Sequence, residues 1–166
     1  CSSDLLRLTA KERGLLTSFE RTRAWFGAEA SPDSLLSADF AAARAWCIVT
    51  HGVQDYRREQ FAGLLLSAGR SSETVFADDL RGTKCPPIVI LAVCSSAASH
   101  KRRGDESSAH MGGTMLANGT VAVVVAGNAL AVGASLEIVA ALQRELSAGR
   151  SVAAALRLAR GAIAAN

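Results

Sequence analysis

The sequence predicts one α/β domain over residues 1–166, a three-layer α/β/α sandwich around a mainly parallel central sheet. Three short runs, residues 46–50, 88–93 and 121–126, are apolar and rich in β-branched residues. Such runs are typical of strands that are buried on both faces. Segments with helical periodicity separate them, and strands that alternate with helices form parallel sheets. A chain of 166 residues is long enough to bury a real core.

The helices of this sandwich are expected at residues 9–26, 34–45, 109–117, 135–146 and 151–164. Thr9 and Glu12 have the spacing of a capping box, and Gly27 is expected to end the first helix. The turn at residues 31–33 leads into the second helix, and Gly149 separates the last two.

A hairpin is expected beside the main sheet. Residues 64–66 and 74–76 are apolar or β-branched, and they flank the turn-rich segment 67–72. Asp78 and Asp79 then cap a short helical turn.

Composition narrows the class of protein. Hydrophobic residues make up 49% of the chain and charged residues 20%, which excludes disorder as the dominant state. The net charge of +3 is a small surplus that does not come from a block of basic residues. Aromatic residues, on which bases could stack, make up only 5% of the chain, so we expect no direct binding to nucleic acid. The most apolar window, residues 120–136, has strand character, and no membrane span is expected.

The four cysteines, Cys1, Cys47, Cys85 and Cys94, have neither the spacing of a disulfide framework nor metal-ligand spacing to histidines. We therefore expect a protein of the reducing cytoplasm, without a metal or a cofactor. The chain begins at Cys1 with no initiator Met and no leader, so it is expected to be a fragment or a processed piece of a longer protein.

The candidate active site lies where two of the predicted strands end. His51 follows the first strand and Cys94 follows the second, and ligands of open α/β sheets bind beyond the carboxyl ends of the strands. An imidazole close to a thiol favours the thiolate and can then protonate a leaving amine. The backbone N–H groups of Gly52 and Cys94 are the expected oxyanion donors.

Short motifs carry a resemblance to a known family. They are residues 48–52 (Ile-Val-Thr-His-Gly), 64–66, 77–80, 90–94 and 104–106, the Asn118-Gly119 turn before residues 121–125, and residues 146–156. In their order and spacing these segments resemble the CHAT domain, a caspase-like cysteine peptidase, over about residues 9–165.

The resemblance implies a caspase-like fold and a peptidase of the caspase, gingipain and separase clan. His51 is then the general base and acid, and Cys94 is the nucleophile. It also implies a protein substrate, with gasdermin-like proteins as one class, and an attached or associated sensor module, such as tetratricopeptide repeats, in a bacterial defence or signalling system. By the same resemblance, the front strands of a full CHAT domain are expected to be missing from this sequence.

Two features after Cys94 have alternative interpretations. Asp105 and Glu106 either line a pocket for a basic substrate side chain or neutralise the adjacent basic run. Residues 100–103 are either a solvated loop or a self-processing site.

The residues around Cys94 leave a second function open. The family usually has Ser-Ala before the cysteine and a Thr-Gly pair soon after it, whereas this chain has Ala92-Val93 and Ser95-Ser96-Ala97. The alternative is a catalytically inactive CHAT-like module that binds partner proteins through the same groove.

Overall fold

A computed structural model of the protein describes residues 8–18, 22–54, 62–68, 71–93, 111–126 and 131–164. The chain forms two compact units. The first consists mainly of residues 25–129, and the second of residues 7–24 and 130–166.

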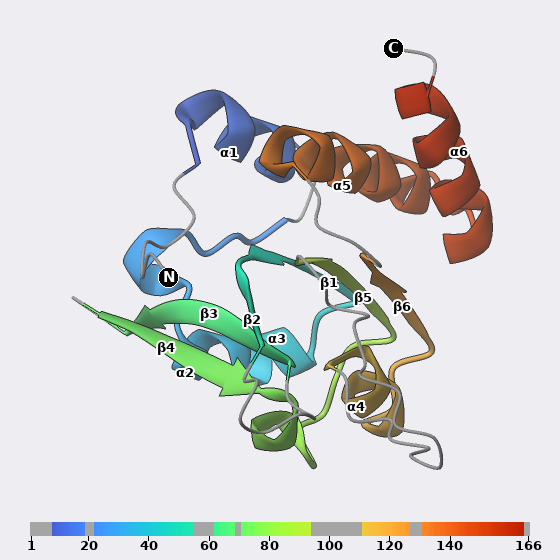
Figure 1. Cartoon of the computed structure of the whole chain (residues 1–166). Helices are drawn as coiled ribbons and strands as arrows, with labels where there is room; N and C mark the ends of the chain where they lie inside the picture. The colour runs from blue at the N-terminus through green and yellow to red at the C-terminus, as the bar shows by residue number, and fades with distance from the viewer. Residues whose placement is uncertain are drawn as a thin grey trace. The chain divides into compact units, whose positions relative to one another are not determined.

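The first unit contains a three-stranded parallel sheet. Its strands are β1 (Ala45–Thr50), β5 (Ile88–Val93) and β6 (Ala122–Val125), in the order β1-β5-β6 (Figure 1). Ala45 is the partner of Ile88 at one end, and Thr50 is the partner of Val93 at the other. The three predicted strands and the α/β class with a mainly parallel sheet are thus confirmed.

A second, antiparallel sheet lies in the same unit. It consists of β2 (Gly52–Gln54), β3 (Ala62–Ala68) and β4 (Ser71–Phe76), in the order β2-β3-β4. The predicted hairpin is β3 and β4, but its turn is tighter than expected. Ser67 pairs with Ser72 and Ala68 with Ser71, because continued pairing satisfies backbone groups that an open turn would leave to water. Strand β2 was not predicted.

The helical segments of the first unit are short. They are η1 (Gly27–Glu29), α2 (Pro32–Leu35), α3 (Ala38–Ala41), η2 (Ala77–Leu80) and α4 (Met111–Ala117). The prediction of one helix over residues 34–45 is wrong, because the Ser37 hydroxyl donates to the Ser34 carbonyl, 2.8 Å away, and accepts from the Phe40 N–H at 3.4 Å. Ser37 therefore ends α2 and starts α3, since serine competes with helical backbone bonding.

The hydrophobic core of this unit is formed by both sheets and α4. Trp46 and Ile48 of β1 contribute to it together with the alternate residues of β5, and the hairpin adds Leu64, Leu66 and Val75. From α4, Met111 and Met115 are fully buried. The Trp46 indole N–H donates to the Phe40 carbonyl, and the Phe40 ring also contacts Trp25 at a centroid distance of 4.8 Å.

The second unit contains three helices, α1 (Ala10–Thr17), α5 (Val132–Ser147) and α6 (Val152–Ala164). The predicted helices at residues 135–146 and 151–164 are confirmed, and Thr9 and Glu12 form the expected capping box. The first helix is shorter than predicted, and residues 22–26 are not helical. Thr17 and Ser18 donate their hydroxyls to the carbonyls of Arg13 and Leu15, which favours an end at this point.

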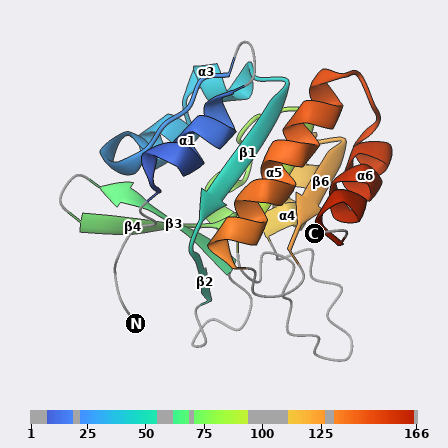
Figure 2. The ribbon, with the colours of Figure 1, turned by 90° about the horizontal axis from the view of Figure 1, so that it is seen from above.

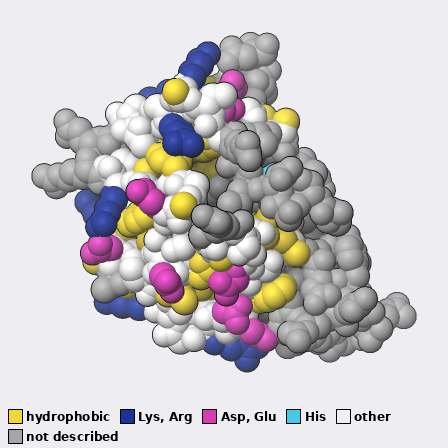
Figure 3. Space-filling model, turned by 90° about the vertical axis from the view of Figure 1, so that its left-hand side faces the viewer, with side chains coloured by type: hydrophobic (Ala, Val, Ile, Leu, Met, Phe, Trp, Pro, Cys, Tyr) yellow, Lys and Arg dark blue, Asp and Glu magenta, His cyan; other side chains and the backbone are white. Residues whose placement is uncertain are grey.

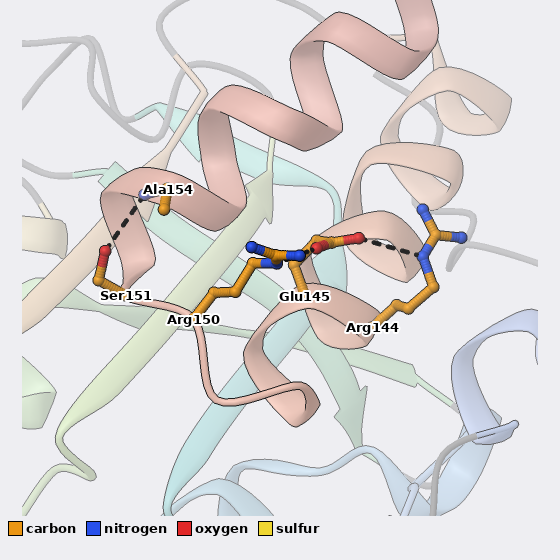
Figure 4. Close-up of polar contacts among 5 residues, drawn as sticks. All are labelled: Arg144, Glu145, Arg150, Ser151 and Ala154. Atoms are coloured by element: carbon orange, nitrogen blue, oxygen red, sulfur yellow. Dashed lines mark hydrogen bonds and ion pairs between the residues drawn. The ribbon is translucent and has the colours of Figure 1, made fainter.

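The corner between α5 and α6 is held by charged and capping contacts (Figure 4). The Glu145 carboxylate lies between two guanidinium groups, with Arg150 at 2.8 Å and Arg144 at 3.4 Å. Gly149 has φ +79°, a conformation that favours glycine, and Ser151 accepts from the Ala154 N–H at the start of α6. Beyond this corner, Ala155 and Ala159 are buried, so that α6 packs closely on α5 (Figure 2).

Charged side chains of both signs are interspersed on the face of the molecule that Figure 3 shows, in agreement with the small net charge of +3. Within the described segments, every helix is too short or too polar to cross a lipid bilayer.

Candidate active site

The carboxyl ends of β1 and β5 lie side by side at one edge of the parallel sheet. Thr50 and Val93 are the last residues of the two strands and are partners across the sheet. Neighbouring strands are about 4.8 Å apart. His51 directly follows Thr50, and Cys94 directly follows Val93 in the sequence. Cys94, Asp105, Glu106 and residues 100–103 lie outside the described residues, so their predicted roles stay predictions.

His51 occupies the junction between the two sheets. It follows the last residue of β1 in the parallel sheet and precedes the first residue of β2 in the antiparallel sheet. Its side chain is exposed. Its backbone carbonyl accepts a hydrogen bond from the Leu65 N–H of β3, at 3.0 Å. The imidazole is therefore open to solvent, while the backbone that carries it is anchored.

Thr50 supplies a second contact with the same residue of β3. Its hydroxyl donates to the Leu65 carbonyl at 2.5 Å. Thr50 and Leu65 were not among the predicted site residues. The alternation of β1 offered a signal for Thr50, because Trp46, Ile48 and Thr50 share one face of the strand, and Thr50 alone among these three is polar. Nothing local in the sequence indicated Leu65.

Gly52, the other predicted oxyanion donor, is the first residue of β2 and is exposed. It is the antiparallel partner of Leu64. A residue without a side chain leaves room beside His51 for the backbone of another chain. The role of its N–H group stays a prediction.

The two described cysteines are free thiols with unreactive surroundings. Burial raises the pKa of Cys47 to about 12. Burial also raises the pKa of Cys85, while interactions with the side chains of Asn118 and Thr120 lower it. The Cys85 sulfur lies 3.5 Å from the Thr83 carbonyl. Since the thiolate is the nucleophile, both residues are poor candidates for covalent chemistry.

Of the two acidic residues predicted to cap η2, Asp79 does so, whereas Asp78 pairs with a basic side chain. Asp79 accepts from the Phe76 N–H at 2.8 Å, and Asp78 forms an ion pair with Arg81 at 2.7 Å. The part of the chain that the structure describes holds no group of three or more His, Cys, Asp or Glu side chains that could bind a metal ion.

The comparison with protein families identifies the chain. A model of the CHAT domain matches residues 4–166, which is nearly the whole sequence. The chain belongs to the CHAT family. CHAT domains form part of the caspase-like cysteine peptidase clan, and the α/β fold with its mainly parallel sheet agrees with that assignment. A search of curated proteins found no relative that matches this CHAT domain.

Proposed function

We propose that this CHAT domain is a cysteine endopeptidase in which His51 and Cys94 form a catalytic dyad. The observation that supports the proposal is the pairing of Thr50 with Val93, the residues that directly precede the two members of the dyad. If this pairing continues for one more residue, positions 51 and 94 lie within the distance that a proton transfer, direct or through one water, requires.

The chemistry of such a dyad needs neither metal nor cofactor. The Cys94 thiolate attacks the scissile carbonyl carbon, and a C–S bond forms. His51 gives its proton to the leaving amine as the C–N bond breaks, which leaves a thioester. Water, deprotonated by His51, then attacks the thioester and releases the carboxylate product and the free thiol.

Backbone donors complete the proposed site. The N–H groups of Gly52 and Cys94 stabilise the oxyanion, and Gly52 allows the substrate backbone to approach. Asp105 and Glu106 are the candidates for binding a basic side chain of the substrate. The substrate is a protein of the cytoplasm, and cleavage is controlled by an attached or associated sensor module.

The test is the reactivity of each cysteine with iodoacetamide, measured by peptide mapping in wild-type protein and in His51→Ala. We expect Cys94 to be alkylated at neutral pH at least about tenfold faster than Cys47 and Cys85, because a neighbouring imidazolium stabilises the thiolate. His51→Ala should remove this excess. Cys47 and Cys85 serve as internal controls, since burial raises the pKa of both.

The alternative is an inactive CHAT-like module that binds a partner protein. The observation that favours it is the sequence around Cys94, where Ala92-Val93 and Ser95-Ser96-Ala97 replace the residues usual in the family. The same experiment separates the two functions. Equal alkylation of all cysteines, or a fast Cys94 that does not depend on His51, contradicts the dyad and supports the binding module.

A further inference from the structure

We propose that Thr50 is a positioning residue for His51. Its hydroxyl ties the carboxyl end of β1 to β3 and thereby fixes the backbone that carries the imidazole at the edge of the parallel sheet. This inference rests on the proposed function, and it assigns to Thr50 no contact with the substrate.

The first observation is that Thr50 carries a hydroxyl on the face of β1 whose other side chains are apolar and buried. Trp46 and Ile48, on the same face of β1, are buried in the core at 3% and 7% exposure. Valine has the shape of threonine and would extend this apolar row. Instead, the Thr50 hydroxyl donates to the Leu65 carbonyl at 2.5 Å, a bond that valine cannot form.

The second observation is that the hydrogen bonds of two consecutive residues converge on Leu65. The Thr50 hydroxyl donates to the Leu65 carbonyl. The Leu65 N–H in turn donates to the His51 carbonyl at 3.0 Å. Beyond this point Gly52 pairs with Leu64. His51 is therefore held between a side-chain bond on one flank and a strand pairing on the other.

The third observation is the exposure of His51 itself. An exposed imidazole gains little restraint from packing, so its position depends on the backbone from which it projects. Proton transfer needs heavy atoms at about hydrogen-bond distance, and a misplacement of about 1 Å can cost about a hundredfold in rate. An anchor one residue away thus acts directly on the geometry of the dyad.

The experiment compares three variants of the full chain. Thr50→Val removes the hydroxyl and keeps the shape, and Thr50→Ser keeps the hydroxyl. Thr120→Val is the matched control, because the Thr120 hydroxyl is buried and donates to the Pro86 carbonyl at 3.0 Å. Thr120 precedes β6 and Pro86 precedes β5, so both lie at the amino ends of these strands, away from the carboxyl ends where His51 lies.

The readout is the alkylation rate of Cys94 with iodoacetamide from about pH 5.5 to about pH 9, a range that brackets the ordinary pKa values of histidine and cysteine. Thr50→Val should lower the rate at neutral pH by about tenfold or more and move the inflection of the profile upward, towards that of His51→Ala. Thr50→Ser should stay within about twofold of wild type. Thr120→Val should reproduce the wild-type profile even if its unfolding midpoint falls.

Two results would overturn the inference. One is a Thr50→Val profile that coincides with wild type, and the other is a Thr50→Ser profile that is lost together with that of Thr50→Val. Thr50→Ala provides a second variant without the hydroxyl if Thr50→Val does not fold. If alkylation of Cys94 in wild type is independent of His51, the proposed function itself fails, whereas failure of the inference alone leaves that dependence intact.

Discussion

Cys47 carries a thiol that stays protonated in the folded protein at pH values where an ordinary cysteine ionises. Burial raises its pKa to about 12. In the unfolded chain the same thiol titrates near pH 8.5. Above that pH the unfolded state releases a proton that the folded state keeps, so rising pH favours unfolding. The stabilising contribution of the neutral thiol is complete below about pH 8.5 and is lost towards pH 12.

We therefore predict that the free energy of unfolding falls above about pH 8.5. One such group contributes at most about 1.4 kcal/mol per pH unit. Cys47→Ala should show a shallower decline, measured by urea unfolding under reducing conditions at several alkaline pH values. If the two proteins decline in parallel, the Cys47 thiol ionises as readily in the folded state as in the unfolded one.

Hairpin β3–β4 depends on a glycine that faces a neighbouring side chain. A Cβ atom placed on Gly63 would lie 2.3 Å from Thr74 Cγ2 and 3.1 Å from Phe76 Cδ1. Phe76 is the strand partner of Gly63, and Thr74 is the partner of the nearby Leu65. This contact leaves no room for a methyl group without a shift of the two strands.

Gly63→Ala should lower the free energy of unfolding by about 1–3 kcal/mol, the usual cost of overpacking. Thr74→Ser removes the methyl group that the new Cβ meets, so the double variant should recover part of the loss. Urea unfolding of the four proteins gives the coupling energy between the two positions. If the losses in free energy of unfolding of the two single variants simply add in the double variant, the cost of Gly63→Ala does not come from contact with Thr74.

Elements with a continuous or periodic apolar pattern were predictable from the sequence. The bounds of two other predicted helices were wrong, because polar side chains end them early. Strands β1, β5 and β6 and helices α5 and α6 match their predicted positions, because burial on one or both faces leaves a strong periodic signal. Ser37 divides a predicted helix in two, and Thr17 and Ser18 shorten another. These side chains bond to the backbone, and hydrophobic periodicity does not register such contacts.

The candidate site was predictable up to the ends of its strands. His51 was expected directly after a buried strand, and the structure agrees. The register that makes Thr50 the partner of Val93, and the bonds from Leu65, join residues that are far apart in the sequence. Contacts of this kind follow from tertiary packing, which a single sequence specifies only through the whole fold.

At the scale of the whole molecule, the positions of the strands in the sequence decide how early each strand meets its partner. β1 ends at Thr50, yet its partner β5 starts only at Ile88. At about 5–20 residues per second, β1 is synthesised seconds before β5, whereas β3 and β4 follow each other directly in the chain and can pair early. We expect the amides of β3 and β4 to become protected from exchange before those of β1 during refolding, as measured by pulse-labelling hydrogen exchange. The edge that holds the proposed dyad therefore forms only after the hairpin, because β1 has to wait for β5.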